Sequence, residues 1–342
     1  SGSPWRAFLQ VIPAIVRAGF VYVSITETGG TLTAVAGPFF ATALPAGDAS
    51  TVHVPLAQSD GLGGLVQLHS GLLCWTGGNI SAALDTDAEA YISAVAAAKG
   101  TAVNSTQQAA INAFVLAEKA ASRWTAHKRL WLPIWNNAGA NSIDMVTRGT
   151  WTAYGSVTAA AGYVTPDGSS GYANLGVSAA ALGLDNASGG MSVLAYVAAS
   201  GAAAQTWMGA YMSGTGCMRL HSSSSVAGFE CMANATGYGV TLARSNQVGI
   251  LSAMRFSGSH VLRQRRAAGV TALGANAQAA DGTAAAGNLF AMAYNNFGSA
   301  SGWCNGSSGF FGVHSGLSTA DTDAYSDNLK TMWETCSGLT LP

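Results

Sequence analysis

The acidic residues between positions 143 and 316 could supply general acid and base chemistry: Asp144, Asp167, Asp185, Glu230 and Asp281. Two carboxylates at a set separation can cleave a glycosidic bond, one donating a proton and the other activating water or attacking the sugar. These five residues are isolated from one another, and no E-x-D-x-E motif occurs. The sequence therefore predicts no catalytic residue and favours a protein that is not an enzyme.

Nucleophile and metal motifs are equally sparse. No G-x-S-x-G elbow occurs, although a Ser/His/Asp triad assembles in space and spacing alone does not exclude one. The six histidines form no H-x-x-x-H or H-x-x-H pair, so we expect no metal and no cofactor. The cysteines are odd in number and show no C-x-x-C spacing, which favours free buried thiols at Cys74, Cys217, Cys231, Cys304 and Cys336.

Aromatic and amide side chains in the second half of the chain could bind sugar. Carbohydrate sites on β-sandwiches combine aromatic surfaces with a few polar groups on a sheet face or in end loops. The same residue types also suit core packing or contacts between subunits, and both interpretations stay open. The candidates for ligand binding are Trp207, Tyr211, Tyr238, Asn295, Asn296 and Trp303.

The chain has very little charge. Charged residues make up 9% of the sequence, with 15 basic and 16 acidic side chains, against roughly 25% in ordinary soluble domains. Nucleic acid is not expected as a partner, because binding to phosphates needs clustered basic residues. The one basic cluster, Arg263, Arg265 and Arg266, is predicted to be a solvated strand face. No apolar run is long enough to span a membrane.

These side chains must be positioned by three predicted domains. Residues 1–84 contain strand-length runs separated by glycine, proline and aspartate turns, which indicates an antiparallel β module used for docking or assembly. The runs are Phe20–Ile25, Thr31–Val35, Thr51–Leu56 and Leu65–His69.

Residues 85–142 are predicted to form a helical hairpin and a hinge. Capping boxes at Thr86/Glu89 and Ser105/Gln108 each precede apolar residues at helical spacing. The following stretch, residues 129–135, holds two tryptophans around Pro133 and is expected to lock the helices onto the rest of the chain.

Residues 143–342 are predicted to be a β-sandwich closed by one helix. Strand-length runs follow one another at the spacing of a sandwich, and Met191, Val193, Ala195 and Val197 fall on one face. A last helix begins at Ser318 and is expected to close an end or edge of the sandwich. The expected strands are 192–198, 206–212, 217–221, 228–232, 239–243, 248–256, 260–266, 289–295 and 309–314.

Four pieces of this region carry a resemblance: Ile143–Val146 (IDMV), Gly149–Thr152 (GTWT), Gly162–Gly176 (GYVTPDGSSGYANLG) and Phe311–Ser326 (FGVHSGLSTADTDAYS). Their order resembles that in the concanavalin A-like, laminin-G-like jelly rolls of bacteriophage tail and virion-surface proteins. The resemblance implies a mainly β protein with a jelly-roll sandwich, and it brings no catalytic signature.

The function that this resemblance implies is structural. We expect a virion protein on the particle surface, in a tail fibre or baseplate or as a decoration on the capsid exterior. Its partners would be other virion proteins and copies of itself in a homo-oligomer, a trimer being one form. One alternative is a host-attachment protein whose jelly roll binds a surface glycan. A second is a polysaccharide depolymerase, for which Glu230 is the carboxylate to test.

Overall fold

The chain forms two compact units, Ser1–Ala83 and Leu84–Pro342. The computed structural model describes five strands of the first unit and, in the second, residues 84–184, 188–198, 205–212, 216–222, 226–233, 239–243, 248–256, 259–276 and 284–342. The side chains of 213–217, 222–247, 257–260 and 276–283 also lie outside the described part.

The first unit contains antiparallel strands, as its alternating runs predict. β2 pairs with β3 and with β4, while β1 pairs with β5, and all three pairings are antiparallel. β1 falls in the apolar N-terminal stretch, where no strand was expected. The bounds are β1 Arg6–Leu9, β2 Val21–Thr28, β3 Thr31–Pro38, β4 Val52–Leu56 and β5 Val66–His69.

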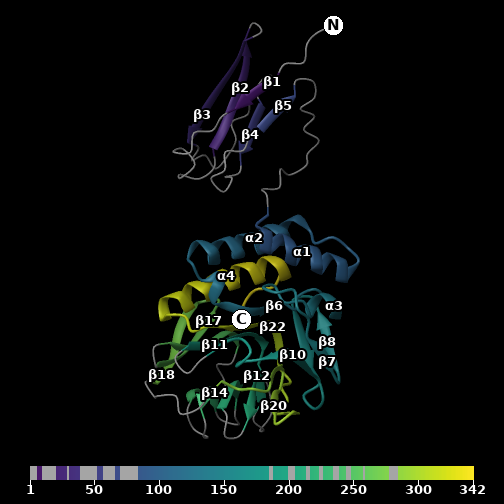
Figure 1. Ribbon diagram of the computed structural model, residues 1–342, viewed down its shortest axis with the longest axis vertical. Helices are drawn as coiled ribbons and strands as arrows, with labels where there is room; N and C mark the ends of the chain where they lie inside the picture. Colours follow the sequence, from purple (N-terminus) through teal and green to yellow (C-terminus); the bar gives the residue numbers. More distant parts are fainter. Residues whose placement is uncertain are drawn as a thin grey trace. The chain divides into compact units, whose positions relative to one another are not determined.

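The second unit is a sandwich of two sheets (Figure 1), which confirms the predicted mainly β fold. Its eight-stranded sheet has the order β18-β17-β16-β11-β22-β9-β8, with β6 also paired to β22. These strands are β6 His127–Trp131, β8 Val157–Ala160, β9 Tyr163–Pro166, β11 Ser188–Val197, β16 Gly249–Phe256, β17 Ser259–Arg266, β18 Gly269–Asn276 and β22 Ser307–His314.

The nine-stranded sheet lies on the other side of the core. Its order is β15-β14-β13-β12-β19-β10-β7, with β20 paired to β12 and to β21. The strands are β7 Thr152–Tyr154, β10 Tyr172–Ser178, β12 Gln205–Met212, β13 Gly216–Ser222, β14 Val226–Ala233, β15 Gly239–Ala243, β19 Asn288–Ala291, β20 Tyr294–Asn296 and β21 Ser299–Ser301.

Alternation along β11 explains how one strand serves two cores. Met191, Val193 and Ala195 point between the sheets, as predicted, whereas Leu194 joins a second core on the opposite side. Val197 was expected on the inner face with them, but it lies at the strand end and is exposed. Because both faces of β11 are buried, the strand is almost continuously apolar.

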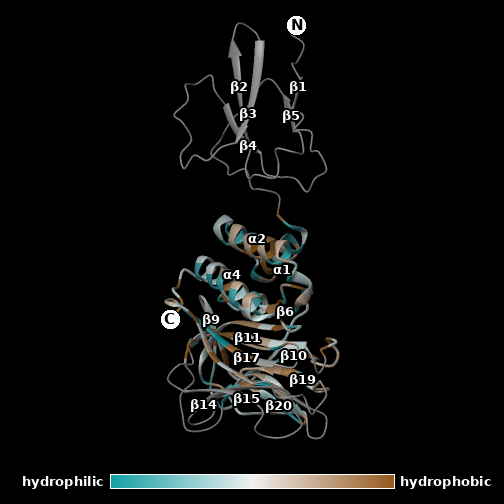
Figure 2. Ribbon diagram, turned by 90° about the vertical axis from the view of Figure 1, so that its left-hand side faces the viewer, coloured by the Kyte–Doolittle hydropathy of each residue, from teal (hydrophilic) through white to brown (hydrophobic). Residues whose placement is uncertain are grey.

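Three helices cover the outer face of the eight-stranded sheet: α1 Thr86–Lys99, α2 Ser105–Ala120 and α4 Thr319–Ser337 (Figures 1 and 2). Their apolar residues share one core cluster with Leu194, Ile250 and Phe310 from the sheet. α4 was expected at an end or edge of the sandwich. It lies instead across the sheet face, where it packs on α2, β16 and β17.

The helix starts agree closely with the sequence, with one systematic difference. Ser318 caps α4 through its hydroxyl, as predicted. The caps of α1 and α2 are Asp85 and Asn104, each one residue before the expected Thr86 and Ser105. Asp and Asn accept from the free amides of a first turn at least as well as Ser and Thr, so both neighbours were suitable caps.

The segment after the helices is a strand rather than a hinge. β6 pairs with β22, and its side chains alternate, with Leu130 toward the helices and Trp131 toward the inter-sheet core. A short helix, α3 Ala138–Asn141, follows it. The predicted 85–142 segment and the 143–342 sandwich therefore fall in one compact unit, because they share strand pairing and a core.

The basic cluster lies on a strand, as predicted, but the prediction that this strand face is solvated is wrong. Arg263 and Arg265 project from β17 toward α4, where they form ion pairs with Asp323 and Asp327. The Arg265–Asp327 nitrogen–oxygen distance is 2.7 Å. These arginines fix the helix on the sheet, so they do not form a solvated face.

Candidate functional site

Trp207 does not face a ligand. It lies in the core between the sheets with 0% of its surface exposed, so its predicted ligand contact is corrected to core packing. The residue sits at a β-bulge in β12, where the register with β13 shifts between Thr206 and Met208. The bulge turns the side chain inward, so the alternation of side chains along the strand does not predict that Trp207 is buried. Tyr238 lies outside the described residues.

Asn295 and Asn296 are adjacent in β20 but have different surroundings. The side chain of Asn295 is buried, accepts a hydrogen bond from the amide of Gly298 at 2.7 Å and donates one to the carbonyl of Asn288 at 2.8 Å. Its role is to hold the β20–β21 hairpin. Asn296 is half-buried and lies opposite Tyr211 in the β12–β20 pairing.

Trp303 belongs to a cluster of aromatic rings on the outer face of the nine-stranded sheet. Tyr154 and Tyr172 are directly opposite in the β7–β10 pairing, and their rings stack at 4.9 Å with planes 11° apart. Tyr172 also contacts Phe290 at 4.7 Å and Trp303 at 5.6 Å. Tyr154 remains 45% exposed. The result is a rigid aromatic cluster that keeps part of its surface in water.

Register shows that this cluster continues toward β12 and β13. Asn174, which shares a face with Tyr172, lies opposite Phe290, and Phe290 and Arg219 each lie opposite Gly209. Tyr211 is two residues beyond Gly209 and therefore on the same face. A side chain at Gly209 would collide with Arg219, so glycine gives the arginine its place. The Arg219 guanidinium carbon lies 5.7 Å from the Tyr211 ring and 5.2 Å from the Tyr294 ring.

We name this surface the aromatic face. Its tyrosine hydroxyls and the Asn296 amide make no hydrogen bond to other groups within the described part of the chain, so they can bond to a ligand. Flat rings with polar groups at their rim are suited to a ligand that has both apolar faces and hydroxyls. The aromatic face consists of Tyr154, Tyr172, Tyr211, Arg219, Tyr294, Asn296 and Trp303.

Two interlocked turns position the Tyr154–Tyr172 stack. Gly155 has φ 61°, and any side chain there would collide with the carbonyl of Ser170. The Asp167 carboxylate accepts hydrogen bonds from the amides of Ser169, Ser170 and Gly171 at 2.7 to 2.9 Å. The Ser170 hydroxyl and these amides hold the pKa of Asp167 well below its usual range. The ordered turn then leads directly into Tyr172.

Asp167→Ala should loosen this turn without unfolding the sandwich. The amides of Ser169 and Ser170 are exposed and can bond to water, so we expect only a small change in the free energy of unfolding. The local effect should be larger, with faster hydrogen exchange at Ser169–Gly171 measured by NMR or mass spectrometry. Asp323→Ala, which removes an acid from α4, is the control. Unchanged exchange at the turn would contradict this role for Asp167.

The sequence missed most of the aromatic face. Tyr154, Tyr172, Tyr294 and Arg219 come from four strands, and only the pairing brings them together. One signal was available, because Tyr172 and Asn174 alternate with buried Ala173 and Leu175 along β10. That pattern assigns Tyr172 to an outer face but does not identify its neighbours.

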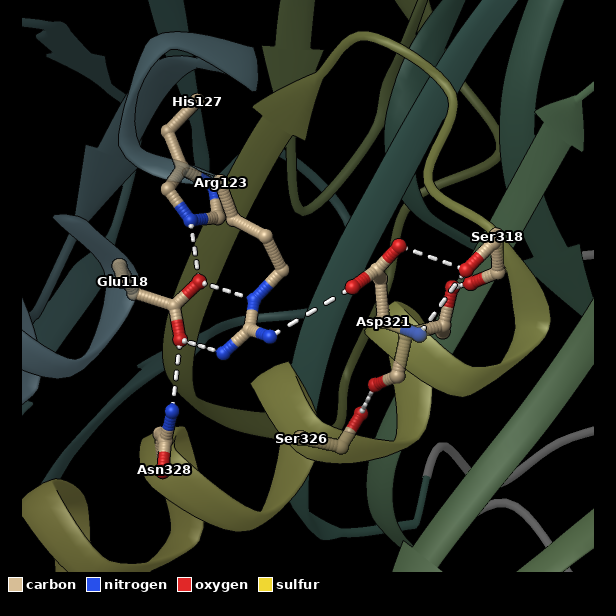
Figure 3. Close-up of polar contacts among 8 residues, drawn as sticks. Glu118, Arg123, His127, Ser318, Asp321, Ser326 and Asn328 are labelled. Carbon is tan, nitrogen blue, oxygen red and sulfur yellow. Dashed lines mark hydrogen bonds and ion pairs between the residues drawn. The ribbon is translucent and has the colours of Figure 1, made fainter. Parts of the chain in front are cut away.

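A cluster of polar side chains lies where α2, β6 and α4 meet, and Figure 3 shows part of it. Glu118 on α2 accepts two hydrogen bonds from Arg123 at 2.8 and 2.9 Å and one from Asn328 at 2.7 Å, and lies 3.0 Å from His127. Burial raises the pKa of Glu118, but these partners outweigh it and lower the pKa to about 2. The carboxylate is therefore a structural anion that joins α2, β6 and α4.

Next to this cluster, Ser192 lies 2.8 Å from His314, the pairing that a hydrolase uses to activate a nucleophile. Both side chains are fully buried, and the Ser192 hydroxyl also donates to Ser252 at 3.2 Å. The buried carboxylate of Glu118 contacts the other histidine, His127, rather than His314. In this structure the serine–histidine pair is a core contact without access to substrate.

The two acidic side chains that the structure describes on the sandwich, those of Asp144 and Asp167, both accept hydrogen bonds from backbone amides. Asp144 is fully buried, and accepts from the amides of Leu130 and Val146 at 2.8 and 3.0 Å. Burial raises the pKa of Asp144. The side chains of Asp185, Glu230 and Asp281 lie outside the described part. Among described residues, no group of three His, Cys, Asp or Glu side chains could hold a metal.

The structure also bears on the expected free cysteines and on membrane-spanning segments. Cys304 and Cys336 are free and buried, as predicted, and burial raises the pKa of each thiol to about 12. The side chains of the other three cysteines are not described. No helix in the described part of the chain is long and apolar enough to cross a membrane.

Comparison with known proteins finds no matching family model and no matching curated protein. Among solved structures, the carbohydrate-binding module CBM40 of the Ruminococcus gnavus IT-sialidase, bound to alpha2,3 sialyllactose, aligns at 12% identity and a TM-score of 0.35. The alignment covers 52% of this chain and 95% of the module.

Two enzymes also align over part of their length. A GH54 α-L-arabinofuranosidase mutant has 12% identity and a TM-score of 0.34, covering 60% of this chain and 44% of the enzyme. The leech intramolecular trans-sialidase has 13% identity and a TM-score of 0.31, covering 41% of this chain. This chain spans only 23% of that trans-sialidase. Scores this low assign no function to the chain.

Proposed function

We propose that the chain is a non-enzymatic surface protein of a bacteriophage virion whose sandwich binds a glycan through the aromatic face. The observation that supports glycan binding is the Tyr154–Tyr172–Trp303 cluster, which is fixed by packing yet partly exposed. The helices cover the opposite sheet, so the nine-stranded sheet is the one that offers an outer face to a ligand.

Sugars match this surface chemically. One side of a pyranose ring is lined by C–H groups, which pack favourably on the electron-rich face of a tyrosine or tryptophan. The sugar hydroxyls can then bond to the phenol groups at the rim and to the Asn296 amide. Arg219 adds a flat cationic group held over Tyr211 and Tyr294. Small-molecule sites usually combine a few polar groups with apolar rings.

The competing explanation is that the rings serve only the sheet. Cross-strand aromatic pairs do stabilise antiparallel strands, by roughly 0.2–1 kcal/mol. Tyr154, however, lies in a three-residue strand whose residues are all exposed. A ring in that position stabilises the sheet little, and its exposed area suits recognition better.

Tyr154→Ala and Trp303→Ala test glycan binding. We expect each to weaken retention on a glycan array about tenfold, because each removes a stacking surface worth on the order of 1 kcal/mol. Thermal unfolding should change little for Tyr154→Ala. Phe256→Ala is the matched control, since Phe256 is a 43% exposed aromatic on the eight-stranded sheet. Equal retention by all three variants would refute binding through the aromatic face, and no retention of the parent protein would refute glycan binding.

The virion role is supported by a different observation. The order of the Ile143–Val146, Gly162–Gly176 and Phe311–Ser326 pieces resembles that in phage surface jelly rolls, and the chain is unusually poor in charge. Its partners would be other virion proteins and copies of itself, on the tail or the capsid exterior. Antibody against the chain should label intact particles in electron micrographs. A protein that never purifies with particles would overturn this role.

A further inference from the structure

The turn between β20 and β21 carries an exposed aromatic ring in a strained position. Asn296 pairs with Ser299, which leaves Phe297 and Gly298 as a two-residue hairpin turn. Both turn residues have positive φ, 53° and 93°. Turns of this kind favour Asn-Gly or Gly-Gly, because the left-handed conformation is sterically unfavourable for other residues. The Phe297 ring is nevertheless 56% exposed.

The rest of the hairpin holds this turn firmly. The buried Asn295 side chain accepts a hydrogen bond from the Gly298 amide at 2.7 Å and is itself fixed through the Asn288 carbonyl. The Phe297 amide donates to the Tyr211 carbonyl at 3.4 Å. The strain is therefore maintained by surrounding contacts, as is common where an unusual backbone serves recognition.

The same ring lies at the edge of the aromatic face. Phe297 packs edge-to-face on Tyr211, with centroids 5.9 Å apart and planes at 82°. Asn296, which precedes it, lies opposite Tyr211 in the sheet. An aromatic ring and an amide thus flank Tyr211, on the side of the face away from Tyr154.

The two ends of the face are too far apart for one sugar ring. Tyr154 on β7 and Tyr211 on β12 are separated by β10 and β19, which makes three strand spacings. At about 4.8 Å per spacing, this distance is at least roughly 14 Å. A ligand that contacts both ends must be extended.

We infer that Phe297 is a second anchor of the aromatic face and that the ligand is a chain of several sugar units rather than a single terminal sugar. One end would stack on the Tyr154–Tyr172–Trp303 cluster and the other on Phe297 and Tyr211. This inference rests on the proposed glycan binding. Two weak contacts on one chain raise the affinity for long ligands, because the second contact forms within the complex.

Phe297→Asn is the decisive variant, because asparagine suits the left-handed turn and keeps the hairpin. The probes are cello-, malto- and chito-oligosaccharides from disaccharide to hexasaccharide, measured by calorimetry on the full chain. In the parent protein, affinity should rise with length. In Phe297→Asn, the affinity for the longest bound saccharide should fall about fivefold or more while disaccharide affinity is unchanged. The melting temperature should stay equal or rise.

The outcomes separate this inference from glycan binding itself. If no saccharide in the panel binds the parent protein, the proposed function and this inference fail together. If disaccharides bind as tightly as hexasaccharides, or if Phe297→Asn binds both normally, only the second anchor is wrong. A lower melting temperature or a changed oligomeric state with normal binding would assign Phe297 to packing or to a contact between copies. Phe256→Asn is the control and should alter none of these affinities.

Discussion

Glu118→Ala is expected to lower the free energy of unfolding by about 3–5 kcal/mol, the cost of breaking a buried ion pair by removing one partner. Glu118 is fully buried and contacts Arg123, His127 and Asn328 (Figure 3). Without the carboxylate, the guanidinium of Arg123 keeps one ion-pair partner among the described residues, Asp321 at 3.6 Å. Urea unfolding followed by tryptophan fluorescence measures the loss.

Two comparisons show whether the loss comes from the unpaired charge. Removing both charges in Glu118→Leu/Arg123→Met should recover much of the stability, because apolar pairs of similar volume often replace buried ion pairs at little cost. Lys119→Ala breaks neighbouring pairs with Asp85 and Asp87 that are partly exposed, and should cost under about 1 kcal/mol. A double variant as unstable as Glu118→Ala would contradict the ion-pair explanation.

Local signals explain why so much of the fold was predictable. Ser318 begins its helix because the hydroxyl and the amide of Asp321 are three residues apart, and that information is entirely local. Most strands of the second half were found for the same reason, with errors of a few residues. The single strand expected over 289–295 is two strands, β19 and β20, and β21 was not predicted. β18 was missed, because its run Gly269–Asn276 is rich in Ala and Gly and has few β-branched residues.

The layers were less predictable, because they depend on contacts between distant segments. Nothing near Arg263 in sequence shows that Asp323 lies over it, so a paired strand was taken for a solvated one. Trp131 was assigned to a hinge because its strand partner, Phe311, is far away in sequence. For both residues, a partner far away in sequence determines whether the side chain is exposed or buried, and the local composition does not reveal that partner.

The same limit applied to the aromatic face. Tyr211 and Trp303 were selected by residue type, and both belong to the aromatic face, whereas Trp207 was selected by type and is buried at a bulge. Side-chain type shows what a residue can bind, and pairing register shows whether it is presented. Because helices fill one side of the sandwich, register on the other sheet determines which aromatics reach the surface.

His314 should make the fold sensitive to mild acid. Burial, together with the neighbouring His127, lowers the pKa of His314 from 6.5 to about 3. The unfolded chain therefore takes up a proton below pH 6.5 that the folded chain does not, so the free energy of unfolding falls as pH decreases. By about pH 5 the contribution of this residue should reach about 2 kcal/mol. The lowered pKa of Glu118 makes stability depend on pH below about pH 4.5, so above that value the effect of His314 can be measured separately.

His314→Phe isolates this effect, because phenylalanine keeps the ring contact with Tyr325 at 5.5 Å and does not titrate. The loss of stability between pH 7 and about pH 5 should be smaller in this variant by about 2 kcal/mol, measured as the difference between urea unfolding curves. Ser192→Ala removes the hydrogen-bond partner at 2.8 Å but keeps the imidazole, so its pH dependence should follow that of the parent. Parallel pH profiles for the parent and His314→Phe would mean that the imidazole is protonated in the folded core, and that acid acts on the protein elsewhere.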